Sequence, residues 1–273
     1  EYLLASGTRA TLDPKINLTG AEWIAAAEVQ RTKHNAVIRA AAATQLPTER
    51  ITQGYRAHVN KDKVQLRKVK AIGAIELSAT PVALNTSTTA AASEALEEAA
   101  ASFRFEDFLL DNNERDLLSR LTFLHEQAGW PDISRGDYAV EVGEVLRGAS
   151  ISKCDMRAAM MRNLPWELAG KLEQSAPERL AVPSGSRPKI SYETRRPVVR
   201  VKLQECFGLA TSPEVSGVRV LFHLLSPAGR ELAVTDDLRS FWDGPYQQVR
   251  KEMRGRYPKH PWPEDPWSAK ATA

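Results

Sequence analysis

The chain has 273 residues, of which 42% are hydrophobic and 26% charged, and its formal net charge is +3 at pH 7. This length exceeds the roughly 100–200 residues of a single domain and supplies apolar side chains for two or three cores. No stretch approaches the ~18 consecutive apolar residues of a membrane span and no basic-then-apolar leader opens the chain, so we expect no contact with a membrane.

The two cysteines, Cys154 and Cys206, lie far apart and belong to no Cys-x-x-Cys motif. This spacing argues against a disulfide scaffold or a zinc site and favours reduced thiols in a cytoplasmic protein. The chain starts without methionine, and residues 1–7 already have the character of folded sequence. We therefore interpret the chain as a piece of a longer protein.

Charge is distributed unevenly along the chain. Residues 51–70 contain six basic side chains and one acidic, residues 86–148 contain five basic and thirteen acidic, and residues 182–260 contain fourteen basic and eight acidic. Two basic regions therefore flank an acidic one. This asymmetry favours a polyanionic partner for the outer regions, or docking of the acidic middle on something basic, although a charged face is often only solvated.

Residues 1–84 are predicted to contain mainly short strands. A strand before Asp13-Pro14 ends where proline forces the preceding residue to be extended. Two alanine-rich stretches, 22–32 and 35–44, remain ambiguous, because alanine favours helix whereas their β-branched and aromatic residues favour strands.

A hairpin is predicted between residues 55 and 77, with a tight turn at residues 60–63. Its second arm, residues 64–70, mostly alternates apolar and polar side chains, which predicts one buried and one cationic face. The cationic face could contact phosphates, but lysines also protect edge strands from aggregation.

Residues 93–180 have a helical pattern. Residues 84–92 are a linker or a helix start, and Ser93 is predicted to cap the helix that follows. Further helices are expected over 113–128, 137–147 and 154–162, and one begins near Pro165. We interpret His125 as a satisfied helix residue rather than a base, and the Met160-Met161 pair as core filling rather than a ligand groove.

After a second linker at 177–183, the pattern predicts an α+β layer on a small sheet. We expect strands at 188–192, 218–226 and 230–235, and helices at 198–207 and 236–242, with Thr235 as an N-cap. Asp236 and Asp237 are explained as first-turn residues rather than as a carboxylate pair for catalysis. The Pro-Ser-Gly-Ser sequence at 183–186 is ordinary turn chemistry, and phosphate binding there is the weaker alternative.

The most distinctive stretch is 238–266, LRSFWDGPYQQVRKEMRGRYPKHPWPEDP. An amphipathic helix over 245–254 should run into Gly255 and then into a rigid, extended arm, because closely spaced prolines forbid helix and central strand. This arm either covers the domain's own core, with Tyr257 and Trp262 as anchors, or lies beside a cationic ridge that faces phosphates.

Catalytic motifs are absent from the sequence. It contains no GxxxxGK[ST] loop, no DEAH-type acidic cluster and no HExxH. No convergent nucleophile or acid/base site can be named, which argues against an independent enzyme.

Several motifs resemble a known family. The stretch 238–266, together with VPSGSRPKISY (182–192), VRVKLQECFGLA (199–210) and HLLSPAGRELAVTDDL (223–238), is similar to the C-terminal region of the HrpB-type bacterial DEAH-box helicases. YLLASGTRATLDP (2–14) is a weaker match, and the middle of the chain matches only in general pattern. The resemblance implies two ATP-hydrolysing motor domains before residue 1, which would hold ATP and Mg²⁺; we expect no cofactor and no metal in this chain.

The resemblance also decides the ambiguous stretches in favour of strands, since it implies an oligonucleotide-binding-fold-like (OB-like) module. The expected fold class is therefore α+β, with a small β-barrel at 1–84, a helical module at 93–180, an α+β module with a small sheet at 182–266, and a tail at 267–273.

The resemblance further implies an accessory region that holds RNA or single-stranded DNA through backbone contacts and supports the motor domains of the same polypeptide. The alternative is a protein-docking or structural module without nucleic-acid contact. The candidate nucleic-acid contacts are Lys63, Arg67, Lys68, Lys70, Arg187, Lys189, Arg250, Lys251, Arg254, Arg256, Tyr257, Lys259, His260 and Trp262.

Overall fold

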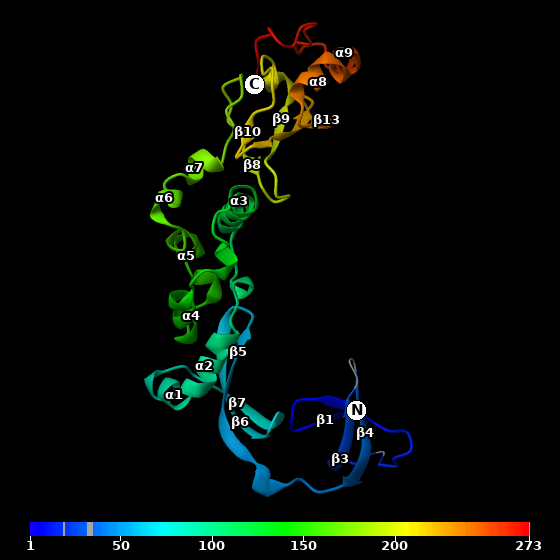
Figure 1. Cartoon of the computed structure of the whole chain (residues 1–273), viewed down its shortest axis with the longest axis vertical. Helices are drawn as coiled ribbons and strands as arrows, with labels where there is room; N and C mark the ends of the chain where they lie inside the picture. The colour runs from blue at the N-terminus through cyan, green and yellow to red at the C-terminus, as the bar shows by residue number, and fades with distance from the viewer. Residues whose placement is uncertain (19, 32–34, 273) are drawn as a thin grey trace. The chain divides into compact units, whose positions relative to one another are not determined.

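The computed structural model (Figure 1) describes residues 1–18, 20–31 and 35–272. The chain divides into two compact units. The first unit comprises Glu1–Arg104 and Ala139–Cys154, and the second comprises Phe105–Tyr138 and Asp155–Ala273. Residues from the 93–180 region contribute to both units, and the three-module division stays a prediction. Within the described residues, no helix has the length and apolar character needed to cross a membrane.

The first unit contains two separate sheets. One has the order β1-β2-β4-β3 and the other the order β5-β6-β7. All pairings are antiparallel except that of β2 with β4. The strands are β1 (Tyr2–Leu3), β2 (Arg9–Leu12), β3 (Ile24–Arg31), β4 (Ala36–Ala43), β5 (Thr52–Asn60), β6 (Lys63–Ile72) and β7 (Ile75–Val82).

Both alanine-rich stretches are strands, as predicted, although Thr32 lies outside the described residues. The expected closed β-barrel is wrong, because the two sheets remain open and separate. A barrel interior must be filled by side chains from every strand. The four-stranded sheet instead buries only Ala10, Ala36 and Ile38 fully, and most of β3 is exposed.

The hairpin of β5 and β6 turns at Lys61 and Asp62, as predicted, with Lys61 at φ 56°. Asp62 also fixes a neighbouring segment: its backbone carbonyl accepts from the Ile151 N–H at 2.8 Å, and its carboxylate accepts from the Ser152 N–H at 2.7 Å. The remaining helices of this unit are η1 (Thr48–Arg50), α1 (Thr86–Ala91), α2 (Ser93–Ser102), α4 (Ala139–Leu146) and η4 (Ile151–Lys153).

Helix α1 resolves the 84–92 stretch as a helix start, because Asn85 forms a capping box with Thr88. The predicted Ser93 cap is wrong. Ala92 precedes α2 without a side-chain cap, since the preceding helix already turns the chain there.

The second unit is built on helix α3 (Asn112–Ala128), which Asp111 and Glu114 cap with a capping box and Gly129 ends at φ 68°. Its buried stripe includes Leu117, Leu121 and Phe123. The shorter helices are η2 (Phe105–Asp107), η3 (Ile133–Arg135), α5 (Met156–Arg162), α6 (Trp166–Ala169) and α7 (Leu172–Ser175).

A mixed sheet of order β13-β12-β9-β8 follows, with β9 and β12 parallel. The predicted helix over 198–207 is wrong: its first half is strand β9 and its second half a short 3-10 turn. Alternating valines explain this, since Val199 and Val201 are buried on one face and Arg200 is exposed on the other. The strands of this sheet are β8 (Ile190–Ser191), β9 (Val198–Lys202), β12 (Leu221–Leu225) and β13 (Glu231–Thr235). The other elements of this part of the chain are η5 (Leu203–Cys206), β10 (Glu214–Val215), β11 (Val218–Arg219), α8 (Leu238–Asp243) and α9 (Pro245–Arg256).

Helix α8 is capped by Asp237, whose carboxylate accepts from the Ser240 N–H at 3.1 Å, so Thr235 is not its N-cap. The α8–α9 pair packs through a ring cluster: Trp242 lies 6.1 Å from Phe207 and 5.4 Å from Tyr246, centroid to centroid. These aromatic contacts hold α9 and the segment after it in place.

Candidate nucleic-acid interface

The four candidate cations of β6 do not share one face. Successive strand side chains point to opposite sides, so Lys63 and Arg67 lie on one face of the sheet and Lys68 and Lys70 on the other. The buried face of β6 also changes along the strand. The even-numbered Val64 and Leu66 are buried in its first half, whereas the odd-numbered Val69 and Ala71 are buried in its second half. The prediction of a single cationic face is therefore wrong for β6.

Three of these side chains, Lys63, Lys68 and Lys70, are exposed. Arg67 is partly buried and forms an ion pair with Glu76 at 3.3 Å, and Glu76 also pairs with Arg56 at 2.9 Å. Arg67 is therefore committed to a contact within its own sheet.

Arg250 on α9 is also committed. Its Nε donates to the Trp262 carbonyl at 2.9 Å, its Nη2 contacts the Glu264 carboxylate at 2.8 Å, and only 16% of its side chain is exposed. Arg250 fastens the segment after α9 to the helix, so it does not belong to an outward cationic ridge.

The four other candidate cations at this end of the chain, Lys251, Arg254, Arg256 and Lys259, are exposed. No ion pair of theirs occurs among residues 1–18, 20–31 and 35–272. Helical rotation of ~100° per residue places Lys251 and Arg254 about 60° apart but Arg256 about 140° from Lys251. The three charges on α9 therefore spread around its end rather than forming one ridge, and Lys259 lies in the turn that follows.

The segment after α9 is not the extended arm that was predicted. The helix continues through Gly255 to Arg256, and a turn follows in which the His260 N–H donates to the Tyr257 carbonyl at 3.1 Å. The buried Trp262 then donates its Nε1–H to Tyr257 at 3.0 Å. The segment covers the domain's own core, as the first interpretation predicted, with Trp262 as its principal anchor.

His260 is exposed and packs edge-on against the half-buried Tyr257, with 6.2 Å between the ring centroids. Trp262 presents no free ring face for stacking, because it is 7% exposed. Aromatic stacking by this segment is therefore restricted to its first turn.

The turn at 183–186 faces the carboxylate of Glu205. The Ser184 hydroxyl donates to the Glu205 carboxylate at 3.3 Å, and the Ser186 hydroxyl donates to the same oxygen. A negative charge at this position repels a phosphate.

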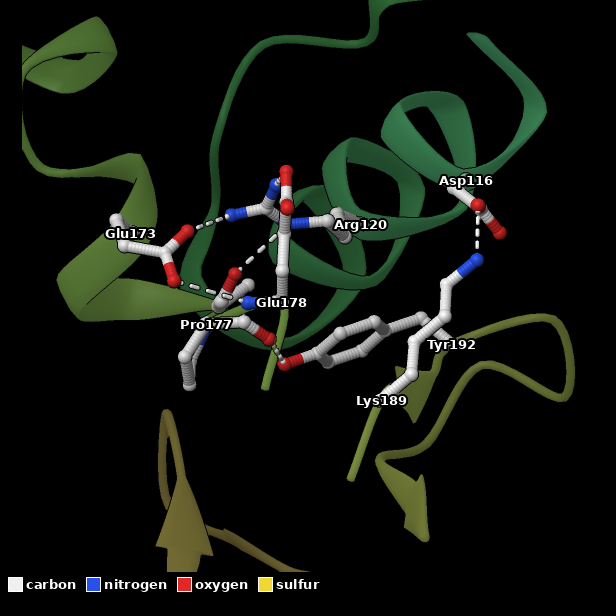
Figure 2. A network of polar contacts seen from close by, with 8 residues as sticks. Asp116, Arg120, Glu173, Pro177, Glu178, Lys189 and Tyr192 are labelled. Carbon is white, nitrogen blue, oxygen red and sulfur yellow. Dashed lines mark hydrogen bonds and ion pairs between the residues drawn. The ribbon is translucent and has the colours of Figure 1, made fainter. Parts of the chain in front are cut away.

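A network of polar contacts joins α3 to the segment 173–192 (Figure 2). Arg120, 4% exposed, donates through Nε to the Ala176 carbonyl at 2.8 Å and contacts the carboxylates of Glu173 and Glu178 at 2.7 Å each. Lys189 forms an ion pair with Asp116 on the same helix. No local pattern predicts the Arg120 network, because its partners lie more than fifty positions away.

Beside this network is a concavity of about 400 Å³, lined by α3, the start of α5 and the two chain segments that pair through Arg179 and Lys189. Arg157 and Arg179 line it, and neither was among the sequence candidates. Arg187, which was a candidate, is exposed nearby, and its carbonyl accepts from Arg179 at 2.9 Å.

Burial shifts the pKa of several side chains in the second unit. Burial raises the pKa of the Cys206 thiol and of the Tyr246 phenol to about 12 each, and it raises the pKa of Tyr192 as well. The Nδ1–H of His125 donates to the Trp130 carbonyl at 2.6 Å, as expected of a satisfied residue. No group of three or more metal-ligating side chains occurs in the part of the chain that the structure describes.

Comparisons with known proteins agree with this architecture. The family described as ATP-dependent helicase C-terminal (HrpB_C) matches residues 139–266. The ATP-dependent RNA helicase HrpB of Escherichia coli (strain K12) is 45% identical over 124 residues, which are 44% of this chain and 15% of that protein.

Two solved structures are similar over nearly the whole chain. The crystal structure of the E. coli DExH-box NTPase HrpB has a TM-score of 0.60 at 27% identity and covers 99% of this chain and 36% of that one. The crystal structure of the Escherichia coli DEAH/RHA helicase HrpB has a TM-score of 0.54 at 24% identity, covers 96% of this chain and 35% of that one, and supports the fold alone. This chain spans about a third of the solved chains. Residues 139–266 therefore resemble the C-terminal region of HrpB-type ATP-dependent helicases, and the chain as a whole is similar in fold to part of the solved HrpB structures.

Proposed function

We propose that this chain is the accessory region of an ATP-dependent RNA helicase that binds single-stranded nucleic acid and supports the motor domains of the same polypeptide. The observation that carries the proposal is the group of four exposed cations at the end of α9, defined by Lys251, Arg254, Arg256 and Lys259. None of them is neutralised by an ion pair within the described residues.

Such a group suits phosphate contacts better than base recognition. Arginine and lysine neutralise backbone charge and release counterions, so binding is independent of sequence and weakens as salt rises. The proposal assigns ATP and Mg²⁺ to the motor domains, places the protein in the cytoplasm and leaves this chain without hydrolytic activity.

The test is binding of a fluorescent single-stranded RNA oligonucleotide by the chain, followed as anisotropy over a range of salt concentrations. Replacing all four residues by glutamine should lower affinity at least tenfold. It should also reduce the slope of log K against log salt by up to ~0.7 per lost phosphate contact. Arg250→Gln belongs outside this set, because Arg250 binds the segment after α9.

A matched control removes the same charge elsewhere. Lys153, Lys171, Arg230 and Arg239 are exposed and form no ion pair among the described residues. Their replacement by glutamine should leave the affinity within about threefold of the unaltered chain. Equal loss in both quadruple variants would show that net charge alone drives binding, and unchanged affinity in the α9 variant would refute the site.

One observation favours the alternative, a protein-docking function. Trp166 in α6 is 81% exposed, more than any other large hydrophobic residue that the structure describes. If it docks on the motor domains, Trp166→Ala should lower the RNA-stimulated ATPase rate of the full-length helicase and leave RNA affinity of this chain unchanged. An unchanged ATPase rate would reject docking through Trp166.

A further inference from the structure

The concavity beside the Arg120 network has more basic than acidic groups in its lining. Arg120, Arg157, Arg179 and Lys189 are its basic side chains, whereas Asp116 and Glu178 are its acidic ones. The carboxylate of Glu173, which also contacts Arg120, reduces this excess without removing it.

The carboxylates are used by only two of the four cations. Arg120 forms ion pairs with Glu173 and Glu178, and Lys189 forms one with Asp116 (Figure 2). The Arg179 guanidinium has a single contact within the described residues, to a backbone carbonyl. Arg157 is exposed and has no hydrogen bond or ion pair there. Two guanidinium groups therefore line the concavity without a counter-charge.

The surroundings select the chemistry of a ligand. A guanidinium presents paired N–H donors that match the two oxygens of a phosphate. Tyr192 lies beneath the network with 3% of its surface exposed, and its hydroxyl donates to the Pro177 carbonyl at 2.8 Å, so its ring is not available for base stacking. The site offers charge and hydrogen-bond donors but no aromatic platform.

We propose that this concavity, the α3 groove, binds a phosphodiester of single-stranded nucleic acid through Arg157 and Arg179. The inference rests on the proposed nucleic-acid function and adds a second contact, separate from the four cations of α9. Lys189 can also contact the phosphodiester, because its ion pair with Asp116 lies at the surface and an exposed pair exchanges partners at little cost. The exposed fractions of the two side chains are 56% for Lys189 and 34% for Asp116. Arg120 stays with its carboxylates and positions the wall of the groove.

The experiment compares Arg157→Gln/Arg179→Gln with the unaltered chain, using the RNA oligonucleotide and salt series described above. Both residues are arginines at the surface, so the variant should unfold within about 2 °C of the original. We expect roughly tenfold weaker binding and a salt slope lower by about 1. Arg157→Lys/Arg179→Lys, which keeps charge but loses the paired donors, should recover part of the affinity.

The control Arg230→Gln/Arg239→Gln removes two exposed charges away from the groove lining and should change the affinity less than threefold. If the unaltered chain fails to bind RNA, the proposed function itself is wrong and the groove inference fails with it. If the unaltered chain binds and the groove variant binds equally well, only the groove inference is wrong. Poly-glutamate is added as a competitor of the RNA. If it displaces the RNA as well as unlabelled RNA does, and the groove variant no longer binds poly-glutamate, the groove recognises an acidic protein partner rather than phosphate.

Discussion

Replacing Arg120 by methionine tests whether the α3 network stabilises the second unit. Methionine preserves most of the buried stem and removes the guanidinium, which is 4% exposed and makes three polar contacts of 2.7–2.8 Å. The carbonyl of the fully buried Ala176 would then lose its donor, which costs about 1–3 kcal/mol.

The two carboxylates contribute less, because they are 63% and 54% exposed and regain water when the arginine is lost. Each such contact accounts for roughly 0.5–1 kcal/mol after screening, well below the ~3–5 kcal/mol of breaking a fully buried pair. The expected total is therefore about 2–5 kcal/mol, a large share of the ~5–15 kcal/mol that stabilises a typical domain.

Urea unfolding followed by tryptophan fluorescence is a suitable assay, since Trp23 is the one tryptophan of the first unit and the other five belong to the second. Glu173→Gln is the matched control: it removes one exposed carboxylate and should lower the free energy of unfolding by less than about 1 kcal/mol. If Arg120→Met is no more destabilising than Glu173→Gln, the buried carbonyl is not the dominant contribution and the reasoning is wrong.

Three further predictions concern other parts of the chain. Trp262→Ala should destabilise the second unit by about 3 kcal/mol, because it empties a buried site, and trypsin should then cut after Lys259 sooner; an unchanged cleavage rate would contradict this. Gly73→Ala should destabilise the first unit by more than about 2 kcal/mol in urea unfolding, since Gly73 has φ +57° and a Cβ there would collide with the Ala5 carbonyl. The hydroxyl of Ser240, and secondly its backbone N–H, donate hydrogen bonds that lower the pKa of Asp237 below the ordinary value of 3.8. The ionised carboxylate therefore stabilises the fold above pH 3.8, and this stabilisation is lost as the pH falls through the lower pKa of the folded state. Asp237→Asn should therefore flatten the fall in melting temperature between pH 5 and 3, and an identical acid profile would argue against the cap.

The sequence by itself determined the elements whose pattern is local. Helix α3 follows from its apolar stripe, its capping box and Gly129, and the hairpin of β5 and β6 follows from alternation around a turn. The proline-rich motifs after α9 indicated the resemblance to HrpB-type helicases without any structural information, because a resemblance of this kind depends on the order of residues alone.

Tertiary structure decided everything that depends on partners distant in sequence. Barrel closure failed because the first sheet buries only Ala10, Ala36 and Ile38, and the alternating valines of residues 198–202 are held as a strand by parallel pairing with β12. The same cause divides the basic residues: Arg250 is held by Trp262, whereas Arg157 and Arg179 meet at one concavity. A cation remains available for a ligand only if no carboxylate or carbonyl folds against it. The order of residues in the sequence does not reveal which of these groups will lie close to it.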